Sequence, residues 1–134
     1  NTTNLAISQI RDSLQLASDA AKIMFESATV PVGKSSFSRS KMGDNGTGAV
    51  YVYYDANGDA IYVGQTGRYV KSRLYDKTSP HAQKAWYNNW VEMRFLPMQK
   101  DADRLVLEFL LIIAYQPPNN LKPSSINVKD LFRL

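Results

Sequence analysis

The sequence predicts a small α/β (α+β) domain in which a three-stranded, largely antiparallel sheet is flanked by helices and preceded by an extra N-terminal helix. Three observations predict this fold. The chain has 134 residues, which is enough for one hydrophobic core. Two β-rich runs flank an Asn-Gly pair, which is typical of a hairpin. Apolar residues also recur at helical spacing on both sides of the hairpin.

The N-terminal third is predicted to be an accessory segment. Residues 5–27 carry apolar side chains at steps of three or four, which predicts one amphipathic helix. Residues 28–48 are rich in Gly, Ser and Pro, which is typical of a linker or flexible loop. We therefore expect residues 1–47 to form a helix and loop, and residues 48–134 to form the core of the domain.

A β-hairpin is predicted over residues 49–64. Its turn is Asn57-Gly58, because both residues tolerate the positive φ of a type I′ turn. Such a two-residue turn places Tyr53 opposite Tyr62.

The hairpin gathers tyrosines on one face. Side chains alternate along a strand, so Tyr51, Tyr53 and Tyr62 share a face, on which Tyr51 lies opposite Gly64. The other face is aliphatic and belongs to the core; it carries Val52, Tyr54, Ile61 and Val63. The tyrosine face has two interpretations, a functional site or an aromatic cluster that stabilises the sheet.

Five further elements are predicted downstream. Alternating polar and apolar side chains predict a half-buried strand over 90–96. The predicted helix over 101–115 is capped by Asp101 and ends before Pro117-Pro118. The elements are a helix over 69–77, a short helix over 81–88, a strand over 90–96, a helix over 101–115, and a final amphipathic segment with Val128, Leu131 and Phe132.

Glu108 is the most informative single residue. It lies within the apolar run 105–113, on a helix that is apolar nearly all round and that we expect to be mostly buried. A buried carboxylate must be paired, hydrogen-bonded, neutralised or bound to a cation. Two interpretations follow, a buried Glu–Arg pair or a metal ligand.

The positive charge is concentrated in one segment. The chain has 16 basic and 12 acidic residues, a net charge of +4. Residues 62–100 hold seven basic and two acidic residues, which gives +5, whereas residues 1–28 hold two and three, which gives −1. This concentration of positive charge favours binding to a polyanion such as DNA. The seven basic residues are Arg68, Lys71, Arg73, Lys77, Lys84, Arg94 and Lys100.

Composition excludes several classes of protein. Without cysteine the chain can form no disulfide, thiol nucleophile or zinc ribbon, and with His81 as its one histidine it can form no two-histidine metal site. No run of about 18 apolar residues is present, so we expect no membrane span. Because the chain begins with Asn1 and not with methionine, we expect a fragment, a processed product or an excised domain.

Taken in order, these residues resemble the GIY-YIG nuclease superfamily over about residues 48–121. The pattern consists of Gly48-Ala49-Val50-Tyr51, then Tyr62-Val63-Gly64, Arg73, Glu108, and Pro117-Pro118-Asn119-Asn120. The chain departs from the family where Ala49 replaces the first motif glycine. Arg73 also falls one residue later than in several members.

The resemblance implies a metal-dependent endonuclease that hydrolyses DNA phosphodiester bonds. By this resemblance Tyr51 acts as or assists the general base, Tyr62 orients water or phosphate, Arg73 binds the scissile phosphate, Glu108 holds one divalent ion, and Asn120 orders the site. A single carboxylate with water and phosphate is typical of Mg²⁺ (or Mn²⁺) coordination.

Further residues are predicted to assist at the site. We expect auxiliary roles for Lys77, His81 and Gln65. For His81 the alternatives to auxiliary catalysis are a DNA contact or plain surface exposure. Nucleic-acid contacts fall to Arg68, Lys71, Lys84 and Arg94.

Several biological settings fit such a nuclease. The first is the toxin domain of an antibacterial effector, delivered from another cell as part of a larger protein, acting in the cytoplasm and restrained by an inhibitory immunity protein. A restriction or phage enzyme is the second, and a repair nuclease the third. The alternative functions are a non-catalytic nucleic-acid-binding module on the same fold, or a nuclease that acts on RNA.

Overall fold

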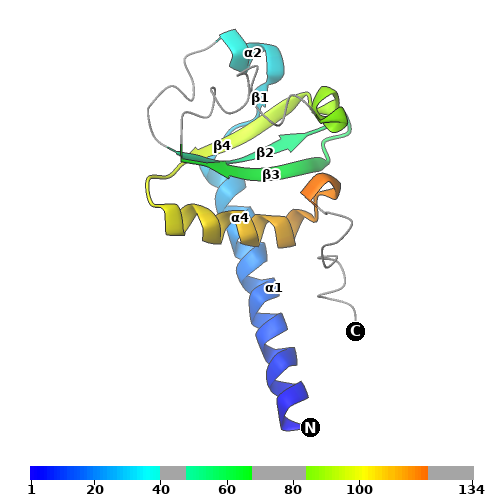
Figure 1. Ribbon diagram of the computed structural model, residues 1–134, viewed down its shortest axis with the longest axis vertical. Helices are drawn as coiled ribbons and strands as arrows, with labels where there is room; N and C mark the ends of the chain where they lie inside the picture. The colour runs from blue at the N-terminus through cyan, green and yellow to red at the C-terminus, as the bar shows by residue number, and fades with distance from the viewer. Residues whose placement is uncertain (40–47, 68–83, 121–134) are drawn as a thin grey trace.

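A four-stranded antiparallel sheet organises the protein. The computed structural model describes residues 1–39, 48–67 and 84–120. The strand order is β1 (Val32–Gly33), β4 (Glu92–Pro97), β2 (Ala49–Tyr54), β3 (Ala60–Thr66). Two helices, α1 and α4, cover one face of the sheet (Figure 1). The α+β class is confirmed, but the predicted count of three strands is wrong.

The additional strand is β1. It has only two residues and pairs with β4 through Val32 opposite Met93 and Gly33 opposite Glu92. Two residues show no alternation, so no sequence pattern could reveal this strand. The segment expected as a linker thus contributes β1 and the short helix α2 (Lys34–Arg39).

The hairpin has the predicted pairing but a different turn. Tyr53 pairs with Tyr62 as predicted. The turn is longer than two residues: the amide of Gly58 donates to the carbonyl of Asp55, and Gly58 has a φ of 82°. The Asp55 side chain stabilises the turn by accepting from the amides of Asn57 and Asp59.

A β-bulge next to this turn lets the longer turn coexist with the predicted pairing of Tyr53 with Tyr62. The pairing shifts between Tyr53 and Tyr54, so Tyr54 pairs with Ala60 and Ile61 is the extra residue. Ile61 was expected on the aliphatic face beside Val63. It instead belongs to the hydrophobic cluster of the tyrosine face, because an extra residue changes the alternation.

The N-terminal helix α1 spans Thr2–Ala28. It begins where the Asn1 side chain accepts a hydrogen bond from the Asn4 amide at 2.9 Å. Phe25 and Ala21 are buried in the core beneath the sheet, and complete burial of Phe25 contributes roughly 1.5–3 kcal/mol. The first half of α1 projects beyond the sheet and α4 (Figure 1). No helix in the described ranges is long and apolar enough to cross a bilayer.

Helix α4 spans Asp101–Tyr115, the predicted bounds. Asp101 is its first helical residue and not its cap; the cap position is Lys100, whose side chain makes no capping hydrogen bond. The expectation of a mostly buried helix is wrong. Leu105, Val106 and Phe109 are each more than half exposed, because only one side of α4 packs on the sheet and α1.

The remaining described elements are short. The helix predicted over 81–88 overlaps the 3₁₀ helix η1 (Ala85–Asn89), and residues 81–83 lie outside the described ranges. The chain leaves α4 through Gln116, which has a left-handed φ of 49°, and enters the 3₁₀ helix η2 (Pro118–Asn120). The helix predicted over 69–77 and the segment with Val128, Leu131 and Phe132 lie outside the described residues.

Candidate functional site

The three predicted tyrosines lie together on one face of the hairpin. The ring centroids of Tyr51 and Tyr62 are 6.3 Å apart, those of Tyr53 and Tyr62 are 6.1 Å apart, and those of Tyr51 and Tyr53 are 5.5 Å apart. Their common face follows from the antiparallel register and confirms the alternation predicted from the sequence.

Aromatic residues of η1 and its C-cap extend the tyrosine face. Tyr62 stacks on Trp86 with a centroid distance of 4.7 Å, and Tyr53 stacks on Trp90 at the same distance. Tyr51 is only 1% exposed and Tyr53 is fully buried, whereas Tyr62 is partly exposed. The face is therefore an aromatic cluster in which Tyr62 is the one of the three hairpin tyrosines that reaches the surface.

Gly64 allows the Tyr51 ring to lie across the neighbouring strand. The two residues are paired in the sheet. A Cβ added at Gly64 would lie 2.5 Å from the Tyr51 hydroxyl oxygen. A glycine is thus required opposite Tyr51, which gives a physical reason for the Tyr-Val-Gly sequence of β3.

Asn120 binds the backbone of β3. Its Oδ1 accepts from the Val63 amide and its Nδ2 donates to the Val63 carbonyl, both at 2.7 Å. Because β3 is an edge strand of the described sheet, no described strand pairs with these two groups on that side, and Asn120 satisfies both. The residue predicted to order the site therefore fixes the strand that carries Tyr62.

Glu108 is half-buried on α4, and its carboxylate makes no hydrogen bond or ion pair with any residue of the described ranges. Burial raises the pKa of this carboxyl above its ordinary value. Within the described ranges the Glu–Arg pair considered from the sequence is not formed, and the buried Arg104 of the same helix pairs with Asp101 instead. No described contact joins Glu108 to Tyr51 or Tyr62, and α4 packs on the opposite face of the sheet.

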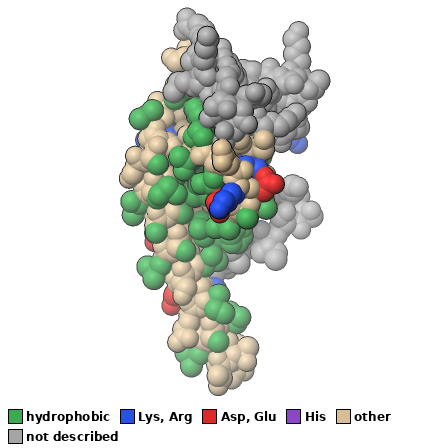
Figure 2. Space-filling model, turned by 90° about the vertical axis from the view of Figure 1, so that its left-hand side faces the viewer, with side chains coloured by type: hydrophobic (Ala, Val, Ile, Leu, Met, Phe, Trp, Pro, Cys, Tyr) green, Lys and Arg blue, Asp and Glu red, His purple; other side chains and the backbone are tan. Residues whose placement is uncertain are grey.

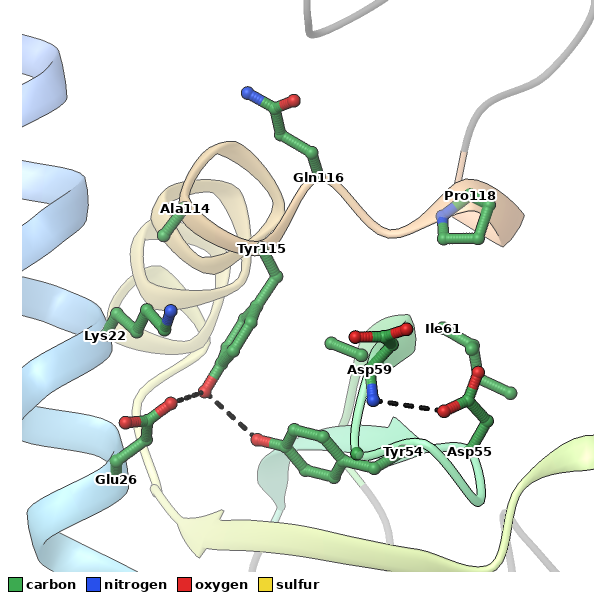
Figure 3. Close-up of a pocket in the computed structure, with 12 residues that line it drawn as sticks. Lys22, Glu26, Tyr54, Asp55, Asp59, Ile61, Ala114, Tyr115, Gln116 and Pro118 are labelled. Carbon is green, nitrogen blue, oxygen red and sulfur yellow. Dashed lines mark hydrogen bonds between the residues drawn. The ribbon is translucent and has the colours of Figure 1, made fainter.

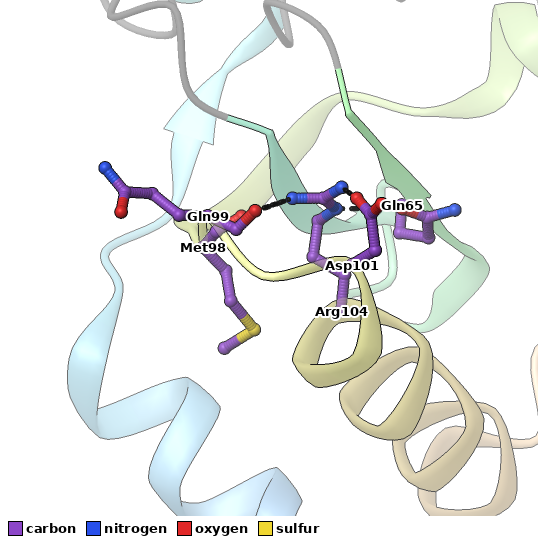
Figure 4. A network of polar contacts seen from close by, with 5 residues as sticks. All are labelled: Gln65, Met98, Gln99, Asp101 and Arg104. Atoms are coloured by element: carbon purple, nitrogen blue, oxygen red, sulfur yellow. Dashed lines mark hydrogen bonds and ion pairs between the residues drawn. The ribbon is translucent and has the colours of Figure 1, made fainter.

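Arg104 is a buried cation that the sequence did not single out. Figure 4 shows its guanidinium at the start of α4, surrounded by acceptors. Nε donates to Gln65 Oε1 at 3.1 Å, and Nη1 donates to the carbonyls of Met98 at 2.7 Å and Gln99 at 2.8 Å. Nη2 pairs with the Asp101 carboxylate. Gln65, a predicted auxiliary residue, thus holds Arg104.

The Arg104 guanidinium also explains two glycines at the ends of the hairpin. A Cβ added at Gly48 would collide with Arg104 Nη1 and with the Thr66 carbonyl, and one at Gly67 would lie 3.2 Å from Arg104 Nη2. Gly48, which precedes the position where Ala49 replaces the motif glycine, therefore has a packing role. An arginine three residues after an aspartate at a helix start was the signal available in the sequence.

Two predicted nucleic-acid contacts differ in their surroundings. Arg94 Nη1 donates to the carbonyls of Glu26 at 3.0 Å and Thr29 at 2.8 Å, so it binds the C-terminal end of α1. Lys84 is exposed at the start of η1. The structure thus gives Arg94 a role in holding α1 and leaves Lys84 accessible.

Lys34 places a further cation beside the aromatic cluster. Its Nζ lies 4.6 Å from the Tyr87 ring centroid and 4.7 Å from that of Trp90. Desolvation by burial lowers the pKa of this ammonium. Five predicted residues lie outside the described ranges: Arg68, Lys71, Arg73, Lys77 and His81.

A separate cavity of about 510 Å³ lies at the turn end of the hairpin. Figure 3 shows the Tyr115 hydroxyl between Glu26 and Tyr54, with which it makes hydrogen bonds of 2.7 and 3.0 Å. Desolvation raises the pKa of Tyr115, as do its hydrogen bonds to Tyr54 and Glu26, so the hydroxyl stays protonated. The cavity is lined mainly by α1, α4 and the hairpin turn, and it shares Ile61 with the cluster of the tyrosine face.

Comparison with protein families, curated proteins and solved structures finds no match to this chain. Within residues 1–39, 48–67 and 84–120, no group of three or more His, Cys, Asp or Glu side chains could hold a metal ion.

Proposed function

We propose that the chain is a metal-dependent endonuclease that hydrolyses DNA phosphodiester bonds. The observation that carries the proposal is the register of β2 and β3, which sets Tyr51 opposite Gly64 and Tyr62 on the same face. The Gly64 packing and the Asn120 hydrogen bonds supply a physical need for two further motif residues. These features support the resemblance to GIY-YIG nucleases stated above.

The proposed chemistry divides among few side chains. Water attacks the phosphorus in line, a new P–O bond forms, and the bond to the leaving oxygen breaks. Tyr62 reaches the surface and would orient the water or the phosphate, Tyr51 would assist removal of the water proton, and Arg73 would bind the scissile phosphate. A half-buried carboxylate with no partner among the described residues suits an oxygen-binding divalent ion, so Glu108 would hold Mg²⁺. This assignment rests on the resemblance and on that carboxylate, because α4 packs on the sheet face opposite the tyrosines.

The setting that we propose is the toxin domain of an antibacterial effector, with DNA as substrate and an inhibitory immunity protein as a further partner. A restriction or phage enzyme is the second setting. The near-complete burial of Tyr51 favours one other function, a nucleic-acid-binding module without catalysis, because a general base must reach its water.

Plasmid cleavage tests the proposal. Supercoiled DNA and a structured RNA are incubated with the chain in Mg²⁺ and then in chelator. We expect Mg²⁺-dependent nicking of DNA, and about 100-fold or greater loss in Glu108→Gln and Arg73→Ala. Asp103→Asn, which changes an exposed carboxylate on the same helix, is the matched control and should retain activity.

A second pair of variants tests the tyrosine face. Tyr62→Phe should lose activity, whereas Tyr53→Phe removes a hydroxyl from the same cluster and should not. DNA binding without cleavage would support the non-catalytic module instead. Cleavage of RNA alone would overturn the choice of substrate.

A further inference from the structure

Helix α1 has a wider apolar surface than the core uses. At about 100° per residue, its five charged side chains fall within a sector of about 100°. The core takes a second sector, with Ser18, Ala21 and Phe25 buried. The remaining sector, about 140° wide, holds only uncharged residues, and all of them are exposed. The charged residues are Arg11, Asp12, Asp19, Lys22 and Glu26.

The exposed sector contains a heptad seam on the side nearer the core. Its residues follow one another at alternating steps of four and three, the spacing of a coiled-coil contact line. Ser13 fits this apolar line because its hydroxyl donates back to the Gln9 carbonyl at 3.0 Å. The seam consists of Ala6, Ile10, Ser13, Ala17, Ala20 and Met24.

An apolar groove continues the seam onto α4. It has a volume of about 510 Å³ and lies between Ala17, Ala20 and Met24 of α1 and Val106 and Leu110 of α4. Figure 2 shows hydrophobic side chains spread along α1 to its projecting end, with few charged side chains among them. The projecting half of α1 and the groove therefore belong to one apolar surface.

We propose that two copies of the chain associate through antiparallel α1 helices, in a dimer with two-fold symmetry. When the two α1 helices overlap along their full length, each large seam residue, Ile10 or Met24, lies opposite an alanine of the other copy. Knobs-into-holes packing requires such large–small pairs. The projecting half of each α1 then lies in the groove of the other copy. The opposed pairs are Ala6 with Met24, Ile10 with Ala20, and Ser13 with Ala17.

The surface has the size that a stable dimer needs. The 27 residues of α1 make a helix about 40 Å long, and its unpartnered sector presents roughly 500 Å². The groove wall from α4 adds to this area. The total is comparable to the ~600–1,000 Å² that each partner buries in a specific interface. An isologous contact between copies also uses the same patch on both chains.

Sedimentation equilibrium of the 134-residue chain tests the dimer. We expect a species of twice the 15.1 kDa chain mass. Ala17→Glu adds a charge to the centre of the seam and should weaken dimerisation at least tenfold. Asn4→Glu adds the same charge to the charged sector and should not. Both residues are exposed, so circular dichroism should be unchanged in both variants.

Cross-linking tests the antiparallel geometry, because the chain has no cysteine. The double variant Ile10→Cys, Ala20→Cys should form a covalent dimer on oxidation, and each single variant should not. A 15.1 kDa species at every concentration, a dimer insensitive to Ala17→Glu, or cross-linking of Ile10→Cys alone would each overturn the proposal. None of these outcomes depends on nuclease activity.

Discussion

The Asn120 side chain makes two hydrogen bonds to the backbone of one residue, Val63, and both are 2.7 Å long. Val63 lies at the centre of an edge strand. The Asn120 side-chain amide therefore bonds to Val63 as a neighbouring strand would. It joins η2, which follows α4, to the strand that carries Tyr62.

Loss of this contact should destabilise the fold. Asn120→Ala leaves the Val63 amide and carbonyl without their partner and should lower the free energy of unfolding by about 1–3 kcal/mol. Asn120→Asp should cost more at pH 7, because a carboxylate oxygen then faces the Val63 carbonyl, and less near pH 3, where the acid can donate. Urea unfolding at both pH values measures this. Equal losses in Asn119→Ala would contradict the assignment.

Gly48 and Gly58 should differ sharply when replaced by alanine. Gly58 has positive φ but open space around its Cα, so Gly58→Ala should cost about 1 kcal/mol. Gly48→Ala drives a methyl group into Arg104 and the Thr66 carbonyl, so backbone must shift and the cost should exceed that of Gly58→Ala. Thermal unfolding compares the stability losses of the two variants. A larger loss in Gly58→Ala would contradict the packing role of Gly48.

Glu108 should make stability depend on pH. Burial raises the pKa of its carboxyl in the folded state above the ordinary value of 4.5. The folded protein therefore holds this proton more tightly than the unfolded chain, and stability is lost as the pH rises through the raised pKa. Glu108→Gln should unfold at a higher temperature than the natural chain at pH 7 and at about the same temperature at pH 4.

A divalent ion at Glu108 should reverse this loss. Mg²⁺ added at pH 7 should raise the unfolding temperature of the natural chain, since a ligand that binds only the folded state stabilises it. It should not do so in Glu108→Gln. Asp103→Asn is the matched control, and an equal Mg²⁺ effect in Glu108→Gln would place the ion elsewhere.

Arg94 and Lys84 should separate structural from nucleic-acid roles. Arg94→Ala removes hydrogen bonds to the end of α1 and should cost about 1.5–3 kcal/mol of stability. Lys84→Ala should leave stability unchanged but lower the salt dependence of DNA binding by about one unit of log–log slope. Fluorescence anisotropy at several salt concentrations measures the slope. A smaller slope in Arg94→Ala alone would reverse the two roles.

The sequence predicted the elements whose pattern repeats over many residues. The β2–β3 pairing and α4 followed from alternation, helical spacing and proline positions, and Tyr51, Tyr53 and Tyr62 were correctly placed on one face. The two-residue strand β1 carries no period, so it was missed. Ile61 was assigned to the wrong face because a bulge, which depends on the turn geometry, interrupts the alternation.

Side-chain partners were harder to predict. An apolar stretch around Glu108 indicated burial, but only the tertiary arrangement shows that one side of α4 stays exposed. For Arg104 the sequence offered only the aspartate three residues before it, because its acceptors at Met98 and Gln99 are backbone carbonyls. Arg94 was expected to contact DNA because of its charge. Charge alone does not show that the backbone carbonyls at the end of α1 accept its hydrogen bonds.

The stacking of Tyr62 on Trp86 and of Tyr53 on Trp90 has a spectroscopic consequence. These are the two tryptophans of the chain, and both belong to the aromatic cluster on the tyrosine face. Intrinsic emission excited at the indole band therefore originates next to the candidate site and nowhere else. Quenching or a spectral shift on addition of an oligonucleotide would report occupancy of that face directly, without an attached dye.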